Sequence, residues 1–572
     1  MKRSMIFFAA LIFPAATLAA TLDVGPSGHT YTSPKAGMDA ASAGDTVLVY
    51  AGTYSIAATI AWVDGVRMLA APGAAPVFDA GLARRIISVT NCTDRRNELR
   101  GITLQNGYQG DYNAGAAILA TSTPNKGYFK ITRCTFFRDS TNVAPTNNTS
   151  YGGAVRFSHE TAIIDSCSFT RCWIFHKAVN WGLSTGDQGG GAIGHTGAAG
   201  DSLIVLSSVF TDCHVGGGKD GTVLQGGAIN AVTTALDSIA TCVFVGNTAQ
   251  SAGAVHSWHP ASGGATVTGC TFTGNAALGA DVTPGNSIAG ALYMDHGAVN
   301  VTHSTFTGNK CKGSGGGLMF HGNGAVSYCT FQGDTAGTGG STGQAAVGGG
   351  LWNAAGSPVD HCEFRDCAAV EGAGLFTGTA TSLLADVGTV SYCLFAGNSV
   401  GSGTYSAGAA ACARMASGVH WAFDHCTFVD NFCGATGRGS VLAESTLAGN
   451  TVYTDLASCV LAWNTTKALP GPLEASTAAA WGASCCNFYG NPLNGTWTAQ
   501  TDCLVDWNYD PCFVGRPAGD FQLARWSQDR PGIGNHPIGC ADIWGYTDAT
   551  QRRRPAGRGP ASGSPIWGWF DQ

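Results

Sequence analysis

The chain has 572 residues, of which 82 are glycine and only 12% are charged, against roughly a quarter charged in an average soluble protein. Because glycine penalises helix interiors, this composition excludes an all-α protein. Hydrophobic residues make up 44% of the chain, which is too apolar for a disordered protein. The net charge is −7 and the arginines at 552–554 are the main basic run, so we expect no nucleic-acid partner.

The first twenty residues have the pattern of an export signal. Lys2 and Arg3 precede an apolar run over residues 5–18, and Ala19 and Ala20 precede Thr21. We therefore expect a signal peptide over residues 1–20 and a mature chain without a transmembrane segment. Such a chain would be secreted, extracellular or held at the cell surface. The alternative is an uncleaved membrane anchor, for which the apolar run is short.

Residues 31–54 predict a short helix followed by a strand. Ser33 suits the N-cap position and Pro34 the first helical position, and an alanine-rich stretch then runs to Gly44. We expect the first strand over residues 46–50. The open end of a stack of repeats exposes core and unpaired strand edges, so this helix is expected to cap it.

Two short motifs alternate along most of the chain. One is Cys-x-Phe-x-x-Asn, as in residues 270–275, and its phenylalanine recurs every 25 to 41 residues at positions 136, 169, 210, 244, 272, 306, 331, 364, 395 and 428. The other is Gly-Gly-Ala followed by Val, Ile or Leu, as in residues 226–229. Short apolar strands at such a period indicate one turn of a parallel β-helix per repeat. The phenylalanines and cysteines would form ladders inside, and the Asn or Asp a hydrogen-bonded ladder at a turn.

The 21 cysteines divide into two groups in this interpretation. Those of the repeat motif would be buried thiols that behave as small hydrophobic residues. Disulfides are expected instead among the others, although their connectivity cannot be read from spacing. A metal site stays a third alternative. The cysteines outside the repeat slot are Cys172, Cys213, Cys311, Cys367, Cys412, Cys433, Cys485, Cys503, Cys512 and Cys540.

The alternation of these two motifs closely resembles the polymorphic outer-membrane-protein repeats of right-handed parallel β-helix surface proteins. Residues 31–54 resemble the opening of pectin-lyase-like β-helix proteins, and residues 510–513 and 520–523 resemble their closing rungs. The resemblance implies an all-β, right-handed parallel β-helix, or solenoid, with a short N-terminal capping helix. The expected divisions are a signal peptide (1–20), the cap and first rungs (21–83), the repeats (84–495), closing rungs (496–540) and a flexible tail (541–572).

The residue that follows each Gly-Gly-Ala-[Val/Ile/Leu] motif is the candidate binding position. Alternation along a strand points it outward, and on successive repeats it would form an exposed aromatic stripe, which is typical of a binding surface. The alternative is that loops such as 276–287 and 335–347 fold over this face and bury it. The candidate binding residues are His256, Tyr293, Met319, Trp352 and Phe376, with Trp258 beside them.

Five other histidines are interpreted as turn residues, because histidine is enriched at positive φ. They lie in turn sequences or directly before the repeat cysteine slot, and no metal is assigned to them. These are His296, His303, His321, His361 and His425.

No catalytic residue is predicted. Polysaccharide lyases of the resembled superfamily carry carboxylates on neighbouring rungs to hold Ca²⁺, whereas Asp165, Asp360 and Asp424 share one repeat position on rungs that are not adjacent. The leading hypothesis is a non-catalytic adhesin or glycan-binding scaffold without a cofactor, whose partner is a polysaccharide or a cell-surface glycan or protein. The alternatives are a carbohydrate-active enzyme, either a pectate-lyase-like polysaccharide lyase with Ca²⁺ or a glycoside hydrolase, and a purely structural spacer.

Overall fold

The computed structural model describes residues 19–499 with gaps, together with residues 513–515 and 520–523. The gaps are 111–114, 123–126, 144–151, 159, 177–187, 198–200, 217–223, 233–235, 260–262, 280–286, 338–345, 379–383, 385–386, 402–405, 417–418, 435–439, 445–452, 467–472, 475–479, 485, 490 and 492–497. Most of the expected signal peptide and closing rungs, and the whole expected tail, lie outside the described residues.

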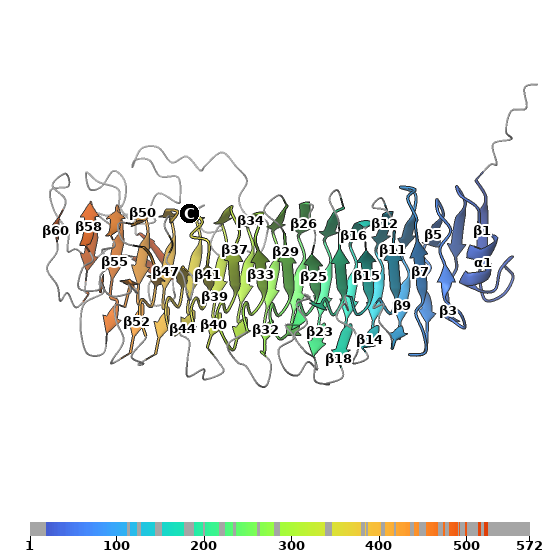
Figure 1. The fold of residues 1–572 in the computed structure, drawn as a ribbon, viewed down its shortest axis with the longest axis horizontal. Helices are drawn as coiled ribbons and strands as arrows, with labels where there is room; N and C mark the ends of the chain where they lie inside the picture. Colours follow the sequence, from blue (N-terminus) through green and yellow to red (C-terminus); the bar gives the residue numbers. More distant parts are fainter. Residues whose placement is uncertain are drawn as a thin grey trace, which may run out of the picture.

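The chain winds as a right-handed parallel β-helix, and each full rung contributes one strand to each of four parallel sheets, here named A, B, D and C in chain order (Figure 1). Sheet A has 17 strands: β1 (Thr21–Val24), β2 (Thr46–Val49), β5 (Arg67–Ala70), β8 (Glu98–Arg100), β12 (Gly127–Thr132), β16 (Glu160–Asp165), β21 (Leu203–Leu206), β26 (Leu236–Ala240), β30 (Gly264–Thr268), β34 (Ala298–Thr302), β38 (Ala325–Ser327), β42 (Val359–Asp360), β46 (Val390–Ser391), β50 (His420–Asp424), β54 (Tyr453–Ala457), β58 (Ala480–Ser484) and β60 (Thr498–Ala499).

Sheet B has 15 strands: β3 (Gly52–Ser55), β6 (Pro76–Asp79), β9 (Thr103–Gln105), β13 (Thr135–Phe137), β17 (Ser168–Thr170), β22 (Val209–Thr211), β27 (Val243–Val245), β31 (Thr271–Thr273), β35 (Thr305–Thr307), β39 (Thr330–Gln332), β43 (Glu363–Arg365), β47 (Leu394–Ala396), β51 (Thr427–Val429), β55 (Val460–Ala462) and β59 (Asn487–Tyr489). Sheet D has 12 strands: β10 (Tyr108–Gln109), β14 (Ser140–Val143), β18 (Trp173–His176), β23 (His214–Gly216), β28 (Thr248–Ala249), β32 (Ala276–Ala277), β36 (Lys310–Cys311), β40 (Thr335–Ala336), β44 (Ala368–Ala369), β48 (Ser399–Val400), β52 (Phe432–Cys433) and β56 (Thr465–Thr466).

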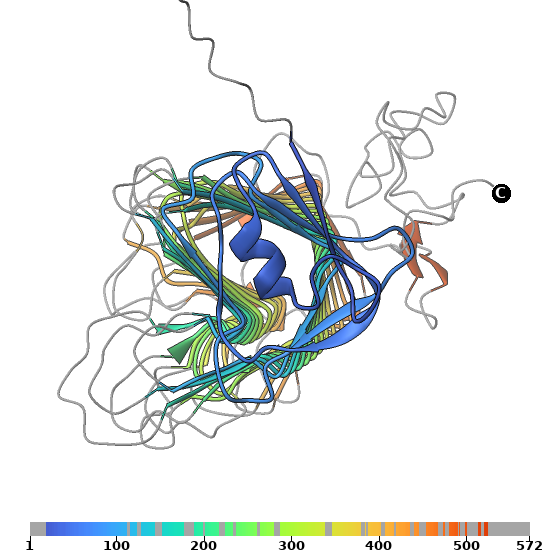
Figure 2. The ribbon, with the colours of Figure 1, turned by 90° about the vertical axis from the view of Figure 1, so that its right-hand side faces the viewer.

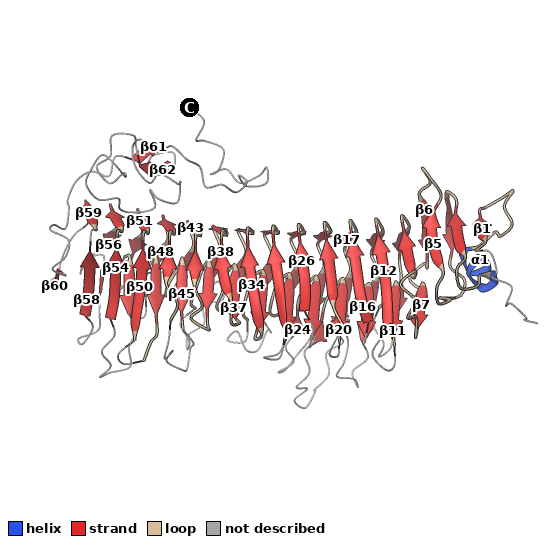
Figure 3. Ribbon diagram, turned by 90° about the horizontal axis from the view of Figure 1, so that it is seen from above, coloured by secondary structure: helices blue, strands red, loops and turns tan. Residues whose placement is uncertain are grey.

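Sheet C, which carries the candidate site, has 14 strands: β4 (Ile60–Ala61), β7 (Ile87–Thr90), β11 (Ile118–Thr121), β15 (Val155–Ser158), β20 (Ile193–Thr196), β25 (Ile229–Val232), β29 (Val255–Trp258), β33 (Leu292–Asp295), β37 (Leu318–His321), β41 (Leu351–Asn353), β45 (Leu375–Thr377), β49 (Ala411–Ala413), β53 (Leu442–Glu444) and β57 (Leu473–Glu474). Two short pairs lie outside these sheets: the parallel pair β19 (Gln188–Gly189) and β24 (Leu224–Gln225), and the antiparallel pair β61 (Phe513–Gly515) and β62 (Asp520–Leu523). Seen from above, the four sheets form one long rod (Figure 3).

The predicted capping helix is confirmed. Helix α1 (Pro34–Ala40) lies across the first rungs (Figure 2), and the Ser33 hydroxyl accepts a hydrogen bond from the amide of Ala36. Met38 is fully buried in the core. The helix ends at Ala40 rather than Gly44, and β1 precedes it, so the first strand comes earlier than expected. Among the described residues, no helix has the length and hydrophobicity needed to cross a membrane.

Ladders of identical side chains fill the interior, as predicted. The ten repeat phenylalanines stack face to face between neighbouring rungs, with ring centroids 4.4 Å apart for Phe136 and Phe169 and 5.0 Å for Phe395 and Phe428. At the turn after sheet B, the Asn247 side-chain amide donates to Oδ1 of Asn275 at 3.0 Å. These ladders position every strand of sheet C by stacking each rung on the one before.

The cysteines of the repeat slot are buried thiols, as predicted, but among the described residues the expected disulfides are not found. All seventeen cysteines in the described residues are buried thiols. Cys172, Cys213 and Cys367 stand in the asparagine slot of the turn ladder: the main-chain amide of Cys367 donates to Oδ1 of Asn398, as an asparagine in that slot does. Burial raises the pKa of Cys134 to about 12, so this thiol is a poor nucleophile. Cys485, Cys503, Cys512 and Cys540 lie outside the described residues.

Candidate binding surface

Two rows of side chains point outward from sheet C. Row one is the residue directly after Gly-Gly-Ala-[Val/Ile/Leu], and row two is the residue two places further along the same strand. In row one, His256, Tyr293, Met319, Trp352 and Phe376 pair in register on successive rungs. In row two, Trp258, Asp295 and His321 do the same. The stacking order expected from the repeat is therefore correct.

Row one is buried, so the expectation of an exposed stripe is wrong. The exposed fraction is 1% for His256, 7% for Tyr293, 6% for Met319, 8% for Trp352 and 0% for Phe376. From Tyr293 onward, these side chains belong to an apolar cluster separate from the main core of the solenoid. They point outward from the sheet, as predicted, but not into solvent.

The chain that enters sheet C covers row one. Isolated parallel bridges link successive rungs just before the glycine motif, for example Ile288 with Ser314 and Val347 with Glu371, and Ile288 and Val347 pack against the row-one cluster. The turn between this ladder and the strand has a positive φ on successive rungs, +65° at Gly226, +54° at Ala252 and +58° at Ala289. This tight turn folds the incoming chain back over row one.

The aromatic end of row one is also held by specific polar contacts. The Trp352 indole N–H donates to the Gly378 carbonyl at 2.7 Å. Arg414 lies 5.3 Å from the centre of the Phe376 ring and forms an ion pair with Glu371 at 2.9 Å. A cation over an aromatic face is attracted by the ring quadrupole. Trp352 and Phe376 therefore contribute to packing and are not a platform for a ligand.

The polar end of row one centres on His256. Its Nδ1 lies 2.7 Å from Oδ1 of Asn230 on the preceding rung, and its ring lies 5.1 Å from that of Tyr293. Burial lowers the pKa of His256 to about 4, against a partial opposing effect from the charge of Asp295. His256 is thus a neutral imidazole in the folded protein at neutral pH.

Row two is more open. The backbone turns after β33 so that His296, at φ +62°, stands beside the strand end. The exposed fraction of the side chain is 53% for His296 and 35% for His321, whereas Asp295 between them is 14% exposed. Trp258 is half-buried on the preceding rung. We call Trp258, Asp295, His296 and His321 the row-two patch.

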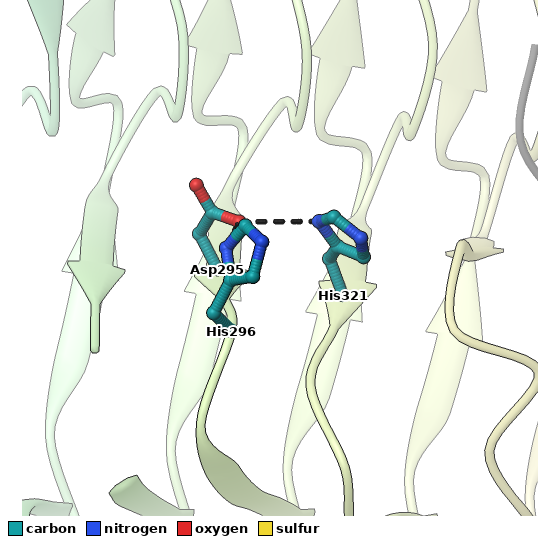
Figure 4. A group of neighbouring side chains, drawn as sticks. All are labelled: Asp295, His296 and His321. Carbon is teal, nitrogen blue, oxygen red and sulfur yellow. Dashed lines mark hydrogen bonds and ion pairs between the residues drawn. The ribbon is translucent and has the colours of Figure 1, made fainter. Parts of the chain in front are cut away.

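Two imidazoles of the row-two patch converge on one carboxylate oxygen (Figure 4). Oδ1 of Asp295 lies 2.5 Å from Nδ1 of His296 and 3.2 Å from Nδ1 of His321. Burial alone would raise the pKa of Asp295, but hydrogen bonds from His321 and Tyr293 hold it below its ordinary value. The group is therefore an anion flanked by two nitrogen ligands. It can hold a cation or accept hydrogen bonds from a ligand's hydroxyl groups.

The prediction that five histidines are turn residues is confirmed in part. The turn prediction is confirmed for four of them, with φ +62° at His296, +51° at His303, +50° at His361 and +52° at His425. It is wrong for His321, which is the last residue of β37. The repeat could have revealed part of the row-two patch, because Asp295 and His321 occupy the same repeat position, two residues after row one.

A carboxylate pair on adjacent rungs also exists, at a repeat position other than that of Asp165, Asp360 and Asp424. Because Ala162 pairs with Leu203, Glu160 and Asp201 occupy equivalent places. Both are buried, with exposed fractions of 0% and 2%, and burial, aided by the charge of Asp201, raises the pKa of Glu160 to about 8. A closed pair of this kind cannot contact a polysaccharide.

Comparison with known proteins supports the architecture. The family model described as a right-handed β-helix region matches residues 253–452, a stretch that includes the row-two patch. Curated proteins gave no match, and neither did solved structures. The finer resemblance to polymorphic outer-membrane-protein repeats stays a prediction. Over residues 253–452, the chain resembles right-handed β-helix proteins.

Proposed function

We propose that the protein is an exported, non-catalytic β-helix scaffold that binds a glycan through the row-two patch. The observation that carries this proposal is the register of Trp258, Asp295 and His321 on three successive rungs, each of them partly exposed. The buried stripe of row one is not the binding surface in this proposal. Of the residues expected from the sequence, Trp258 alone remains a direct contact.

The chemistry of the patch suits a sugar. An indole offers a flat apolar face together with a polar edge, and a carboxylate and imidazoles offer acceptors and donors for hydroxyl groups. Trp258 and Asp295 lie in register on neighbouring rungs, about 4.8 Å apart along the rod. A single saccharide can therefore contact the ring and the polar groups together.

Binding of the soluble full chain to immobilised and soluble polysaccharides tests this proposal. We expect Trp258→Ala to weaken binding at least about 30-fold, the loss expected for an aromatic hot spot worth about 2 kcal/mol. His425→Ala is the matched control, because His425 is a partly exposed ring with an Asp424 partner elsewhere on the rod. Equal binding by Trp258→Ala and wild type would refute the proposed site.

A carbohydrate-active enzyme is the second candidate, and the Asp295–His321 pair favours it. A carboxylate hydrogen-bonded to an imidazole is a common acid–base arrangement. Absorbance of unsaturated products from acidic polysaccharides, with and without Ca²⁺, tests for lyase activity, and release of reducing sugar tests for hydrolysis. Turnover that Asp295→Asn abolishes would establish this candidate in place of the scaffold.

A further inference from the structure

We propose that Asp295, His296 and His321 form a binding site for one divalent transition-metal ion of the Zn²⁺ class. The inference concerns the metal alone and does not depend on which ligand the row-two patch binds.

The donor atoms of the three side chains converge. They all lie within 4.8 Å of one another, and Asp295 Oδ1 lies 2.5 Å from Nδ1 of His296 and 3.2 Å from Nδ1 of His321. Zinc bonds to nitrogen and oxygen of about 2.0–2.2 Å place neighbouring ligands of a tetrahedral site roughly 3.3–3.6 Å apart. A small opening of the two imidazoles around the carboxylate therefore makes room for one ion.

The donor set has the chemistry of a transition-metal site. Two imidazoles and one carboxylate are characteristic ligands of zinc and of first-row transition metals. Ca²⁺ and Mg²⁺ prefer shells made of oxygen, so this set discriminates against them. Each neutral imidazole would carry its hydrogen on Nε2 and give the Nδ1 lone pair to the ion, so that no net proton is lost.

The backbone and a neighbouring side chain fix the positions of the three ligands. Asp295 and His321 are paired residues on adjacent strands, and the His296 amide donates to the His321 carbonyl at 3.0 Å. Tyr293 hydrogen-bonds the Asp295 carboxylate, the kind of outer contact that orients a metal ligand. Three ligands leave at least one coordination position open to water or a ligand.

The other histidine–aspartate pairs of the described residues are simpler. Each joins one imidazole to one carboxylate: His259 with Asp237, His361 with Asp360, His420 with Asp455 and His425 with Asp424. Within the described part of the chain, the row-two patch is the one place where three such groups come together. A simple ion pair does not need the second imidazole.

The test is metal titration of the purified full chain after chelator treatment and dialysis. Calorimetry with Zn²⁺ gives the affinity and stoichiometry, and Co²⁺ absorption identifies the ligands, because thiolate-to-cobalt charge-transfer bands would reveal binding by cysteine instead. We expect one equivalent bound without thiolate bands. Asp295→Asn and His321→Ala should weaken it about 100-fold or more, and Tyr293→Phe about tenfold, within the range for an outer-shell partner.

His425→Ala is the matched control and should bind the metal as wild type does. Thermal unfolding of each variant separates loss of the site from loss of the fold. A wild-type chain that binds neither ion, or ligand variants that keep the wild-type affinity and stoichiometry, would overturn the metal site. Repeating glycan binding with and without chelator keeps the two proposals distinguishable, since either result can fail while the other stands.

Discussion

The side chains of row one and row two lie on the same side of sheet C, two residues apart along the same strands, yet their exposure to solvent differs. His256 is 1% exposed, whereas Trp258 on the same strand is half-buried and His321 in row two is 35% exposed. Strand alternation sets which face of a sheet a side chain occupies. Whether a side chain there meets solvent depends on where the connecting chain runs, and on the rungs of Trp258, Asp295 and His321 it covers row one and leaves row two partly exposed.

The largest expected effect is the cost of removing a row-one ring. Phe376→Ala should lower the free energy of unfolding by about 3–5 kcal/mol, because the ring is fully buried and its loss leaves a cavity. Chemical denaturation followed by circular dichroism measures this. A loss below about 1 kcal/mol would mean that row one is solvent-exposed, as the sequence analysis expected.

The repeat predicted the interior well because stacking imposes one residue type per slot. The phenylalanine and cysteine ladders follow directly from motif spacing, and the capping helix follows from Ser33, Pro34 and the alanine-rich stretch after them. All six described cysteines that were expected in disulfides are buried thiols. Three of them, Cys172, Cys213 and Cys367, each follow a repeat Cys or Ser by five residues, as the ladder asparagines do. Strict alignment of that offset would have placed them in the turn ladder.

The outer surface was predicted less well, for a physical reason. Burial of row one depends on contacts between one rung's incoming chain and the next strand, and the segments between repeats vary in length and sequence. The convergence of Asp295, His296 and His321 needs both the inter-rung register and the positive φ of His296. The repeat predicts the first and the turn sequence predicts the second, but the meeting of the three side chains at one carboxylate oxygen appears only in three dimensions.

His256, the polar residue of row one, should make the free energy of unfolding depend on pH. Burial lowers the pKa of His256 to about 4, against about 6.5 in the unfolded chain. The unfolded state then binds the extra proton between these values, so stability is full above pH 6.5 and is lost as the pH falls toward 4. The loss is about 3 kcal/mol. Denaturation of wild type and His256→Gln at pH 7, 5 and 4 should diverge accordingly, and parallel curves would contradict the burial of His256.

Cysteine labelling compares the two rows directly. Met319→Cys places a thiol in row one and Trp258→Cys places one in row two. We expect a maleimide to label the row-two thiol about 100-fold faster under native conditions, because labelling in row one requires local opening. The wild-type chain gives the background from its native thiols. Equal rates at the two positions would remove the distinction between the rows.

The smallest expected effect is the stability cost of a row-two ligand. His321→Ala, measured by denaturation in chelator, should cost no more than about 1 kcal/mol, because a partly exposed hydrogen-bonded pair contributes little. A loss similar to that of Phe376→Ala would place His321 among the packing residues. If the cost is small, the pairing of two imidazoles with Asp295 is not explained by folding stability. Its presence on an otherwise charge-poor solenoid then points to binding as the reason for these residues.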